Sequence, residues 1–190
     1  MPPRNDAALE FLKTRRSRPA KTLQAPGPSR AELEALLEIA ARVPDHGKLE
    51  PWRFVVIEGA AMPKLADAAE QASANAGEDA EKTAKARAQF DMGTCAVAVV
   101  VSPVPSEKVP EIEQVYSAGA VCLSLVNAAL ASGWGANWLS GAPSHDRGFV
   151  EGALGLAAHE SIAGFIHIAT ETAPAPERPR PDVKAKTTWV

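Results

Sequence analysis

The sequence predicts an α+β fold built as a single domain, and three observations support this. The chain has 190 residues, enough for one domain with a substantial core and few for two independent cores. Short β-branched runs are separated by helical stretches of unequal length, which favours a mixed α+β layer over a regular βαβ repeat. We find no internal repeat. One domain is therefore expected over residues 1–190, with an extended, proline-rich C-terminal arm over about 171–190 that packs on another part of the protein.

The first elements are predicted to be two helices. Asp6 to Thr14 suits a short helix, and the chain must leave it before Pro19 because proline disfavours helical backbone at the preceding residue. Ser29 and Glu32 form a capping box, and leucines and alanines then recur at helical spacing as far as Val43. The second helix is therefore expected to begin just after Ser29.

Strands and helices alternate through the middle of the chain. The run "RFVVIE" at 53–58 is short and β-branched, so a buried strand is expected there. The clearest strand is "TCAVAVVV" at 94–101. Between them, residues 63–74 have leucine and alanine on one face, and 78–90 are rich in Ala, Glu and Lys, so two helices are expected.

A long apolar helix dominates the second half. Residues 113–132 are apolar on most faces, which is typical of a helix buried in the core or in a subunit interface, and Gly133 ends it. The remaining elements are predicted to be a short strand or loop over 134–142, a modest helix capped by Ser144 and running through Leu154, and a strand over 161–170.

Composition and charge exclude several classes of protein. The net charge is −3, from 20 basic and 23 acidic residues, so no global electrostatic argument favours nucleic acid or an anionic membrane as a partner. Cys95 and Cys122 lie inside apolar runs, which predicts reduced core thiols. The amino terminus lacks the apolar region of a signal peptide, and the stretch 115–131 is shorter than the about 20 apolar residues of a membrane span. We expect a soluble, cytoplasmic protein.

Several kinds of catalytic and binding site find no support. The pair Gly133-Trp134-Gly135 follows a helix rather than a strand, so no dinucleotide-binding fingerprint is present, and there is no phosphate-binding loop or nucleophile elbow. Asp45, His46 and Glu50 are close in sequence, but a turn with one histidine makes a poor zinc site, so no metal is expected. His167 lies in a predicted strand, where a satisfied core histidine is expected.

Two polar segments leave alternatives open. The turn "RVPDHGKLEPW" at 42–52 is consistent with a solvated connection between a helix and a strand, or with a loop that grips a ligand through His46 and Glu50. Arg15, Arg16 and Ser17 offer two guanidinium groups and a hydroxyl that suit a phosphate monoester. A basic pair at a helix end also stabilises the helix dipole, so the residues alone decide neither case.

Taken together, four segments resemble the minimal, single-domain members of the nitroreductase family. They are "RRS" at 15–17, "PDHGKLEPWRFVVIEG" at 44–59, "YSAGAVCLSLVNAALASGWGANWLSGA" at 116–142, and the proline-arginine tail, in the same order and over nearly the whole chain. The resemblance implies a nitroreductase-like fold with a mostly antiparallel central sheet flanked by helices. It also implies a homodimer that has the long buried helix in its core and binds FMN at the subunit interface.

The resemblance assigns roles to individual residues. Arg15, Arg16 and Ser17 match the segment that holds the flavin phosphate and ribityl end, and Arg178 and Arg180 stand where larger family members place additional phosphate-binding residues. His46 and Glu50 match positions that reach the flavin from the partner subunit. Two further stretches are a segment near the flavin ring, Trp138, Leu139 and Ser140, and a stretch linked to the nicotinamide donor, Ala128, Ala129, Leu130, Ala131, Ser132 and Gly133.

The implied activity passes electrons from NADH or NADPH through FMN to a nitroaromatic, a quinone or a similar small-molecule acceptor by a ping-pong mechanism. The cofactor carries this chemistry, so no side chain is assigned a catalytic role. An alternative from another class is an FMN-binding protein that stores or senses flavin without physiological turnover.

Glu50 departs from the family pattern, which usually has an amide at this position. An ionised carboxylate only accepts hydrogen bonds, whereas an amide also donates. We hypothesise that Glu50 accepts from a flavin N–H and that its charge lowers the flavin reduction potential. The alternative is an ordinary loop ion pair with Lys48 or Arg53.

Overall fold

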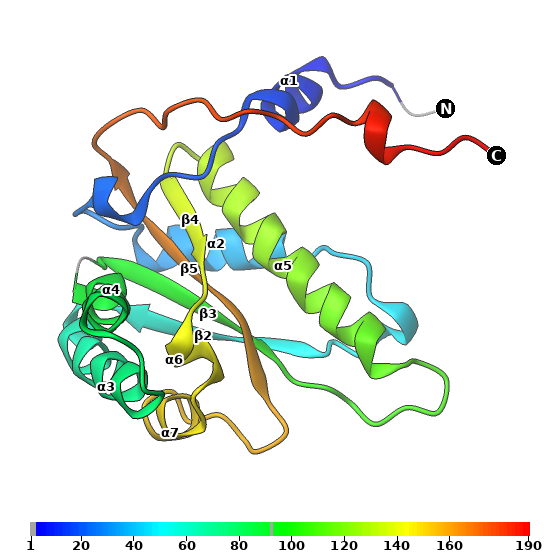
Figure 1. Ribbon diagram of the computed structural model, residues 1–190. Coiled ribbons are helices and arrows are strands. Elements are labelled where there is room, and N and C mark those ends of the chain that lie inside the picture. Colours follow the sequence, from blue (N-terminus) through cyan, green and yellow to red (C-terminus); the bar gives the residue numbers. More distant parts are fainter. Residues whose placement is uncertain (1–2, 92) are drawn as a thin grey trace.

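The central sheet is antiparallel at every strand pairing. The computed structural model describes residues 3–91 and 93–190, and within them five strands form one sheet (Figure 1). Its order is β1-β5-β3-β2, with β4 pairing β5 as well. The strands are β1 (Leu23–Gln24), β2 (Trp52–Glu58), β3 (Cys95–Val101), β4 (Gly135–Leu139) and β5 (Ser161–Glu171). This confirms the α+β class and the three strong predicted strands. The two-residue β1 was not predicted, because it is too short to show a periodic pattern.

The longer helices begin and end close to where the sequence predicts. Ser29 and Glu32 make both halves of the capping box at the start of the second helix, which ends a little before Val43. Gly77, after the third helix, has a φ of 73°, a conformation that favours glycine and stops the helix. These helices are α1 (Asp6–Thr14), α2 (Arg30–Ala40), α3 (Met62–Asn75), α4 (Ala80–Asp91) and α5 (Glu111–Ala131).

The predicted helix from Ser144 to Leu154 is wrong. The segment forms two short helices, α6 (Ala142–His145) and α7 (Arg147–Gly152). Asp146 caps the second of them, because its carboxylate accepts a hydrogen bond of 2.7 Å from the Phe149 N–H. Ser144 instead lies inside α6, where its hydroxyl is buried without a partner among residues 3–91 and 93–190.

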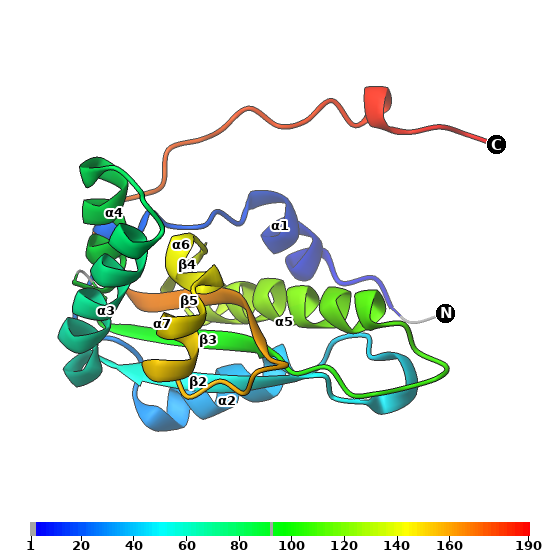
Figure 2. The same cartoon turned by 60° about the horizontal axis from the view of Figure 1, so that its bottom comes forward.

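Helices cover both faces of the sheet. α2 and α5 pack on one face, where Val97 and Val99 of β3 meet Val121 and Leu125 of α5. α3, α7 and Phe90 of α4 pack on the opposite face (Figures 1 and 2). Because β3 is buried on both faces, every residue in it can be apolar, which explains its unbroken run of small and β-branched residues.

The two thiols are free and lie in the core, as predicted. Burial raises the pKa of Cys95 to about 11 and that of Cys122 to about 12. Both therefore stay protonated near neutral pH and behave as small apolar side chains.

α5 is the predicted long apolar helix, and one of its faces is exposed in the single chain. Its length and composition would satisfy a membrane span, but half of the apolar stretch is buried inside the fold. Ile112, Tyr116 and Leu123 are 52%, 67% and 47% exposed. With Gly119 they recur at helical spacing, so they form one apolar stripe along α5, called the α5 seam below.

His167 lies in the core, but it is not the satisfied histidine that the sequence predicts. Its side chain is 3% exposed, and Nε2 has no hydrogen-bond partner among the residues that the structure describes. Phe90 packs 6.1 Å from the imidazole, measured between ring centroids. Burial in these surroundings lowers the pKa of His167 to about 4.

We expect His167 to make the protein sensitive to mild acid. The unfolded chain binds this proton near pH 6.5 and the folded chain only near 4, so stability falls as pH drops from about 6.5 to 4, by about 3 kcal/mol. Urea unfolding at several pH values should show this slope. His167→Leu should flatten it, whereas exposed His159→Gln should leave it unchanged. An equal slope in His167→Leu would contradict the assignment.

Candidate cofactor site

A cavity of about 590 Å³ lies where the end of α1, β4 and the C-terminal tail meet. Its volume is typical of a small-molecule site. Figure 2 shows the tail leaving β5 and running as an extended arm. The cavity is called the arginine cavity below, and its polar lining consists of Arg15, Arg16, Ser17, Asn137, Trp138, Arg178 and Arg180.

The segment after α1 is fastened to the sheet by backbone contacts. The Arg18 N–H donates to the Ala136 carbonyl at 2.8 Å, and the Asn137 side-chain amide donates back to the Arg18 carbonyl. The Arg18 guanidinium forms an ion pair with Glu171 at the end of β5, at 2.6 Å. These contacts give Arg15, Arg16 and Ser17 a fixed position beside β4.

Arg15 has unused capacity to bind an anion. Its Nη2 donates to the Ser17 hydroxyl at 3.0 Å, while its Nε is buried without a partner in the described part of the chain. Burial, and then the positive charges of Arg16, Arg180 and Arg18, lower the pKa of Arg15. A group of like charges with a free buried donor favours a doubly charged anion, and a phosphate monoester fits that requirement.

Glu177 in the tail is a polar residue of this region that the sequence did not single out. Its Oε1 accepts hydrogen bonds from Arg16 Nη1 at 2.9 Å and from the Arg178 N–H at 3.0 Å. The same oxygen lies 3.0 Å from Arg180 Nη2. One carboxylate oxygen thus gathers three N–H donors, as a phosphate oxygen would. The tail therefore contacts the cavity at this point, whereas Trp189 near its end is exposed.

His46 and Glu50 lie at the other end of α5. His46 Nδ1 is 2.6 Å from Glu113 Oε2 in the first turn of that helix. The Asp45 carboxylate accepts from the Leu49 N–H at 3.2 Å and from the Glu50 N–H at 2.8 Å. This turn is therefore tied to α5 and folded on itself, rather than a loose connection.

The turn also has an unusual backbone. Gly47, Lys48 and Glu50 have φ values of 75°, 53° and 48°. Left-handed backbone is costly for residues other than glycine, and it persists where the surroundings impose it. The Ser117 hydroxyl adds one such constraint, because it donates to the Pro44 carbonyl at 2.8 Å.

One chain does not bring these two groups together. Arg15 to Ser17 lie beside β4, which follows the end of α5, whereas His46 contacts its beginning. A helix of 21 residues is about 30 Å long. That length exceeds the reach of a mononucleotide, so both groups can contact one cofactor only if they come from different chains.

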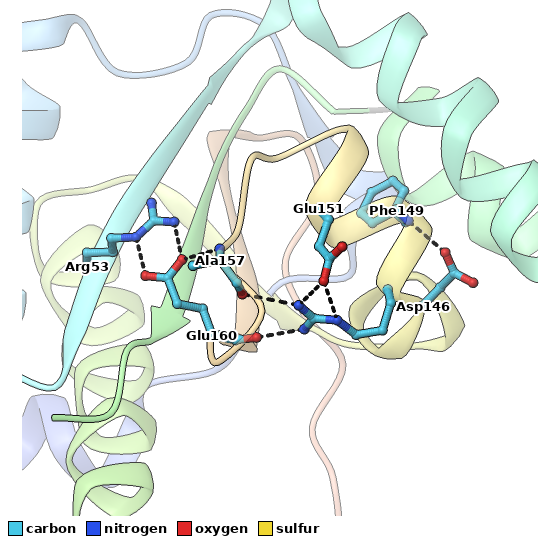
Figure 3. Close-up of polar contacts among 7 residues, drawn as sticks. Arg53, Asp146, Phe149, Glu151, Ala157 and Glu160 are labelled. Atoms are coloured by element: carbon cyan, nitrogen blue, oxygen red, sulfur yellow. Dashed lines mark hydrogen bonds and ion pairs between the residues drawn. The ribbon is translucent and has the colours of Figure 1, made fainter. Parts of the chain in front are cut away.

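The ordinary ion pair considered for Glu50 is not formed. Arg53 donates through Nε and Nη2 to the two carboxylate oxygens of Glu160, at 2.6 Å each (Figure 3). Arg53 thereby holds the pKa of Glu160 at about 2. Among the described residues Glu50 has no ion-pair partner, Lys48 included.

Figure 3 also shows the hydrogen bonds by which the residues around the Arg53–Glu160 pair hold the loop before β5. Glu160 accepts from the Ala157 N–H at 2.9 Å, and Arg147 donates to the carbonyls of Glu160 and Ala157 at 2.7 and 3.1 Å. The loop before β5 is thus fastened to β2 and α7. These charges have structural partners and lie outside the arginine cavity.

The remaining residues that were predicted to contact the flavin or the nicotinamide donor differ in how deeply they are buried. Ala128 and Ala129 are buried in the core, Leu130 is half-buried, and Ala131 to Gly133 are exposed. Leu139 is half-buried. Ser140 lines a separate cavity of about 260 Å³ beside Lys82 and Lys85 of α4. A nicotinamide donor in solution can therefore contact residues 131–133, but it cannot contact the buried Ala128 and Ala129.

Comparisons with known proteins agree with this architecture. The model of the Nitroreductase family matches residues 12–170. The Escherichia coli K12 protein named "Putative NAD(P)H nitroreductase YdjA" is 36% identical over 163 residues, which cover 86% of this chain and 87% of that protein. A "Putative NAD(P)H nitroreductase" of Haemophilus influenzae is 35% identical over 164 residues, covering 86% and 88%.

Solved structures share the fold at lower identity. A nitroreductase-like family protein from Bacillus cereus superimposes with a TM-score of 0.81 at 23% identity, covering 100% of this chain and 98% of that one. A Desulfovibrio desulfuricans protein, described as a "putative nitroreductase in complex with fmn", has a TM-score of 0.72 at 19% identity, covering 96% of each chain. The fold is therefore nitroreductase-like, as predicted.

Proposed function

Because the chain belongs to the nitroreductase family, we propose that it is an FMN-dependent NAD(P)H oxidoreductase that works as a cytoplasmic homodimer. The observation that carries the proposal is the arginine cavity, in which Arg15 combines a free buried donor with three neighbouring positive charges. The separation of His46 from this cavity along α5 supports a site completed by a second chain.

The residues of the cavity have distinct tasks in this proposal. Arg15, Arg16 and Ser17 hold the phosphate of FMN, with help from Arg178 and Arg180 of the tail. Trp138 forms one wall. His46 and Glu50 of the second subunit complete the site, and Leu139 at the end of β4 and Ser140 after it lie beyond Trp138. FMN, when bound, supplies the hydride and electron transfer chemistry, so the protein needs only to bind, orient and exclude water.

The nicotinamide donor and the electron acceptor use the same opening in turn, which gives ping-pong kinetics. The exposed residues Ala131, Ser132 and Gly133 are available to the donor, either NADH or NADPH. Nitroaromatics, quinones and related electron-poor compounds are the proposed acceptors, because a reduced flavin passes electrons to many such molecules.

Two measurements on the purified protein test the function. We expect bound FMN to give visible absorbance after reconstitution and gel filtration, and a preparation that stays colourless with added FMN would refute the proposal. Anaerobic NADH or NADPH should then bleach the bound flavin, and a nitro compound or a quinone should restore its absorbance. Flavin that binds without bleaching would support storage or sensing instead.

Glu177→Gln is expected to tighten FMN binding by about threefold. The carboxylate of Glu177 competes for the donors of Arg16 and Arg180 that a phosphate needs, and exposed ion pairs of this kind are weak. Fluorescence titration with FMN measures the change. Glu81→Gln, on exposed α4, removes the same charge elsewhere and should have no effect. Weaker binding in Glu177→Gln would show that the carboxylate supports the cavity rather than competing for it.

Glu50→Gln is expected to raise the reduction potential of the bound flavin. No cation of the described residues neutralises Glu50, so its charge opposes the added negative charge of a reduced flavin nearby. Spectroelectrochemical titration of the FMN-loaded dimer gives the midpoint potential. Glu38→Gln, at an exposed position of α2, serves as control. An unchanged or more negative midpoint would reject the role of Glu50.

A further inference from the structure

Trp138 forms a wall of the arginine cavity and rests against the neighbouring strand. It stands opposite Ile166 in the β4–β5 pairing. Its indole Nε1 donates to the Ala163 carbonyl at 3.2 Å. The side chain remains 40% exposed, so the indole is covered on the side of β5 and partly open to solvent.

Gly164 lies directly behind the indole. A Cβ placed at Gly164 would lie 3.0 Å from Trp138 Cε2 and closer still to Nε1 and Cδ1, so any side chain there would collide with the ring. The three nearest atoms to this position all belong to Trp138. Gly164 is not among the glycines with positive φ, so its backbone conformation does not require glycine. Glycine is required here because the Trp138 indole occupies the space of a Cβ atom.

We propose that Gly164 is a positioning residue of the cofactor site, which seats the Trp138 indole flat against β5 and so keeps the arginine cavity deep enough for FMN. The inference rests on the proposed function for its ligand. A side chain at Gly164 would push the indole away from the sheet, because the β5 backbone closes the other direction. The displaced ring would then occupy cavity volume.

Another glycine of the sheet shows the contrast. A Cβ at Gly135 in β4 would meet the Ala169 carbonyl and the side chains of Leu23 and Glu171. Glycine is needed at position 135 because the Ala169 carbonyl and these two side chains lie too close to the β4 backbone to admit a Cβ atom. Gly164 differs because its nearest contacts are with one side chain that also lines the cavity.

The test is a double-mutant cycle between Gly164→Ala and Trp138→Ala, read by FMN titration. Gly164→Ala in the otherwise native chain should weaken FMN binding by about tenfold, since overpacking forces the ring out of place. In the Trp138→Ala background, the same substitution should change the affinity by less than about twofold. Gly152→Ala, where an added Cβ meets open space, is the matched control.

A second readout does not depend on the cofactor. In the protein without FMN, Gly164→Ala should shift the tryptophan emission to longer wavelength, because the indole becomes more exposed, and Trp138→Ala should abolish that shift. If Gly164→Ala alone fails to fold, the double variant should regain the native circular dichroism spectrum, and its failure to do so would overturn the proposal.

Two negative results have different meanings. Equal effects of Gly164→Ala in both backgrounds, together with an unshifted emission, would overturn the positioning role while FMN binding stands. A native protein that does not bind FMN would refute the proposed function, and the emission measurement would still report whether Gly164 seats the indole.

Discussion

Arg15→Ala is expected to weaken FMN binding by about a hundredfold. A guanidinium that donates two hydrogen bonds to a phosphate loses about 1.5 kcal/mol for each when it is removed. The buried Nε of Arg15, which has no partner among the described residues, is one of these donors. The second is Nη2, which donates to the Ser17 hydroxyl in this structure. Fluorescence or calorimetric titration of the apoprotein with FMN gives the ratio of dissociation constants.

The same substitution should not destabilise the apoprotein, which separates binding from folding. Arg15 is surrounded by Arg16, Arg18 and Arg180, and burial with these charges lowers its pKa. Removing it relieves repulsion, so the melting temperature without FMN should stay level or rise. Arg30→Ala, which removes an exposed arginine paired with Glu34, is the control. Unchanged FMN affinity in Arg15→Ala would show that the phosphate binds elsewhere.

Leu123→Glu is expected to convert the proposed dimer into monomers and to abolish FMN binding at micromolar concentrations. Leu123 is exposed in the single chain, so a carboxylate there costs the monomer little. In the core of an interface the same charge is desolvated without a partner and costs several kcal/mol. Sedimentation velocity gives the oligomeric state, and titration of the same samples gives FMN affinity.

The two readouts are expected to change together, because His46 and Glu50 reach the cofactor only from a second chain in the proposed site. Ala84→Glu, which adds a charge to exposed α4, should leave a dimer that binds FMN normally. A Leu123→Glu monomer that binds FMN with native affinity would show that one chain makes a complete site. A Leu123→Glu dimer would exclude the α5 seam as the interface.

Much of the fold was predictable because its signals are local. Ser29 and Glu32 are three residues apart and fix the start of α2 by themselves. β3 is recognisable because burial on both faces leaves no polar position in it. Ser144 misled because it precedes a helical stretch, whereas Ala142 begins one short helix with Pro143 in its first turn, and Asp146 caps the next. Two cap-forming residues so close together cannot be ranked without the tertiary contacts.

The cofactor site was predictable only in part for a related reason. Arg15, Arg16 and Ser17 are adjacent, so their combined chemistry is visible in the sequence. Glu177 is separated from Arg16 by 161 positions, and no local pattern links them. Gly164 lies in a strand whose sequence gives no sign that a tryptophan from β4 needs its space. Both residues matter through one long-range contact, which only the folded chain reveals.

The arginine cavity draws on residues 15–19, 137–138 and 175–181, and this has a consequence for biosynthesis. A nascent chain presents the first group early, but the last group leaves the ribosome only after β1 to β5 have been synthesised. The complete site proposed for FMN therefore exists only after the strands of the sheet and α5 have been synthesised. Under the proposed function, binding of FMN to the complete cavity is thus a late step that follows synthesis of the whole sheet.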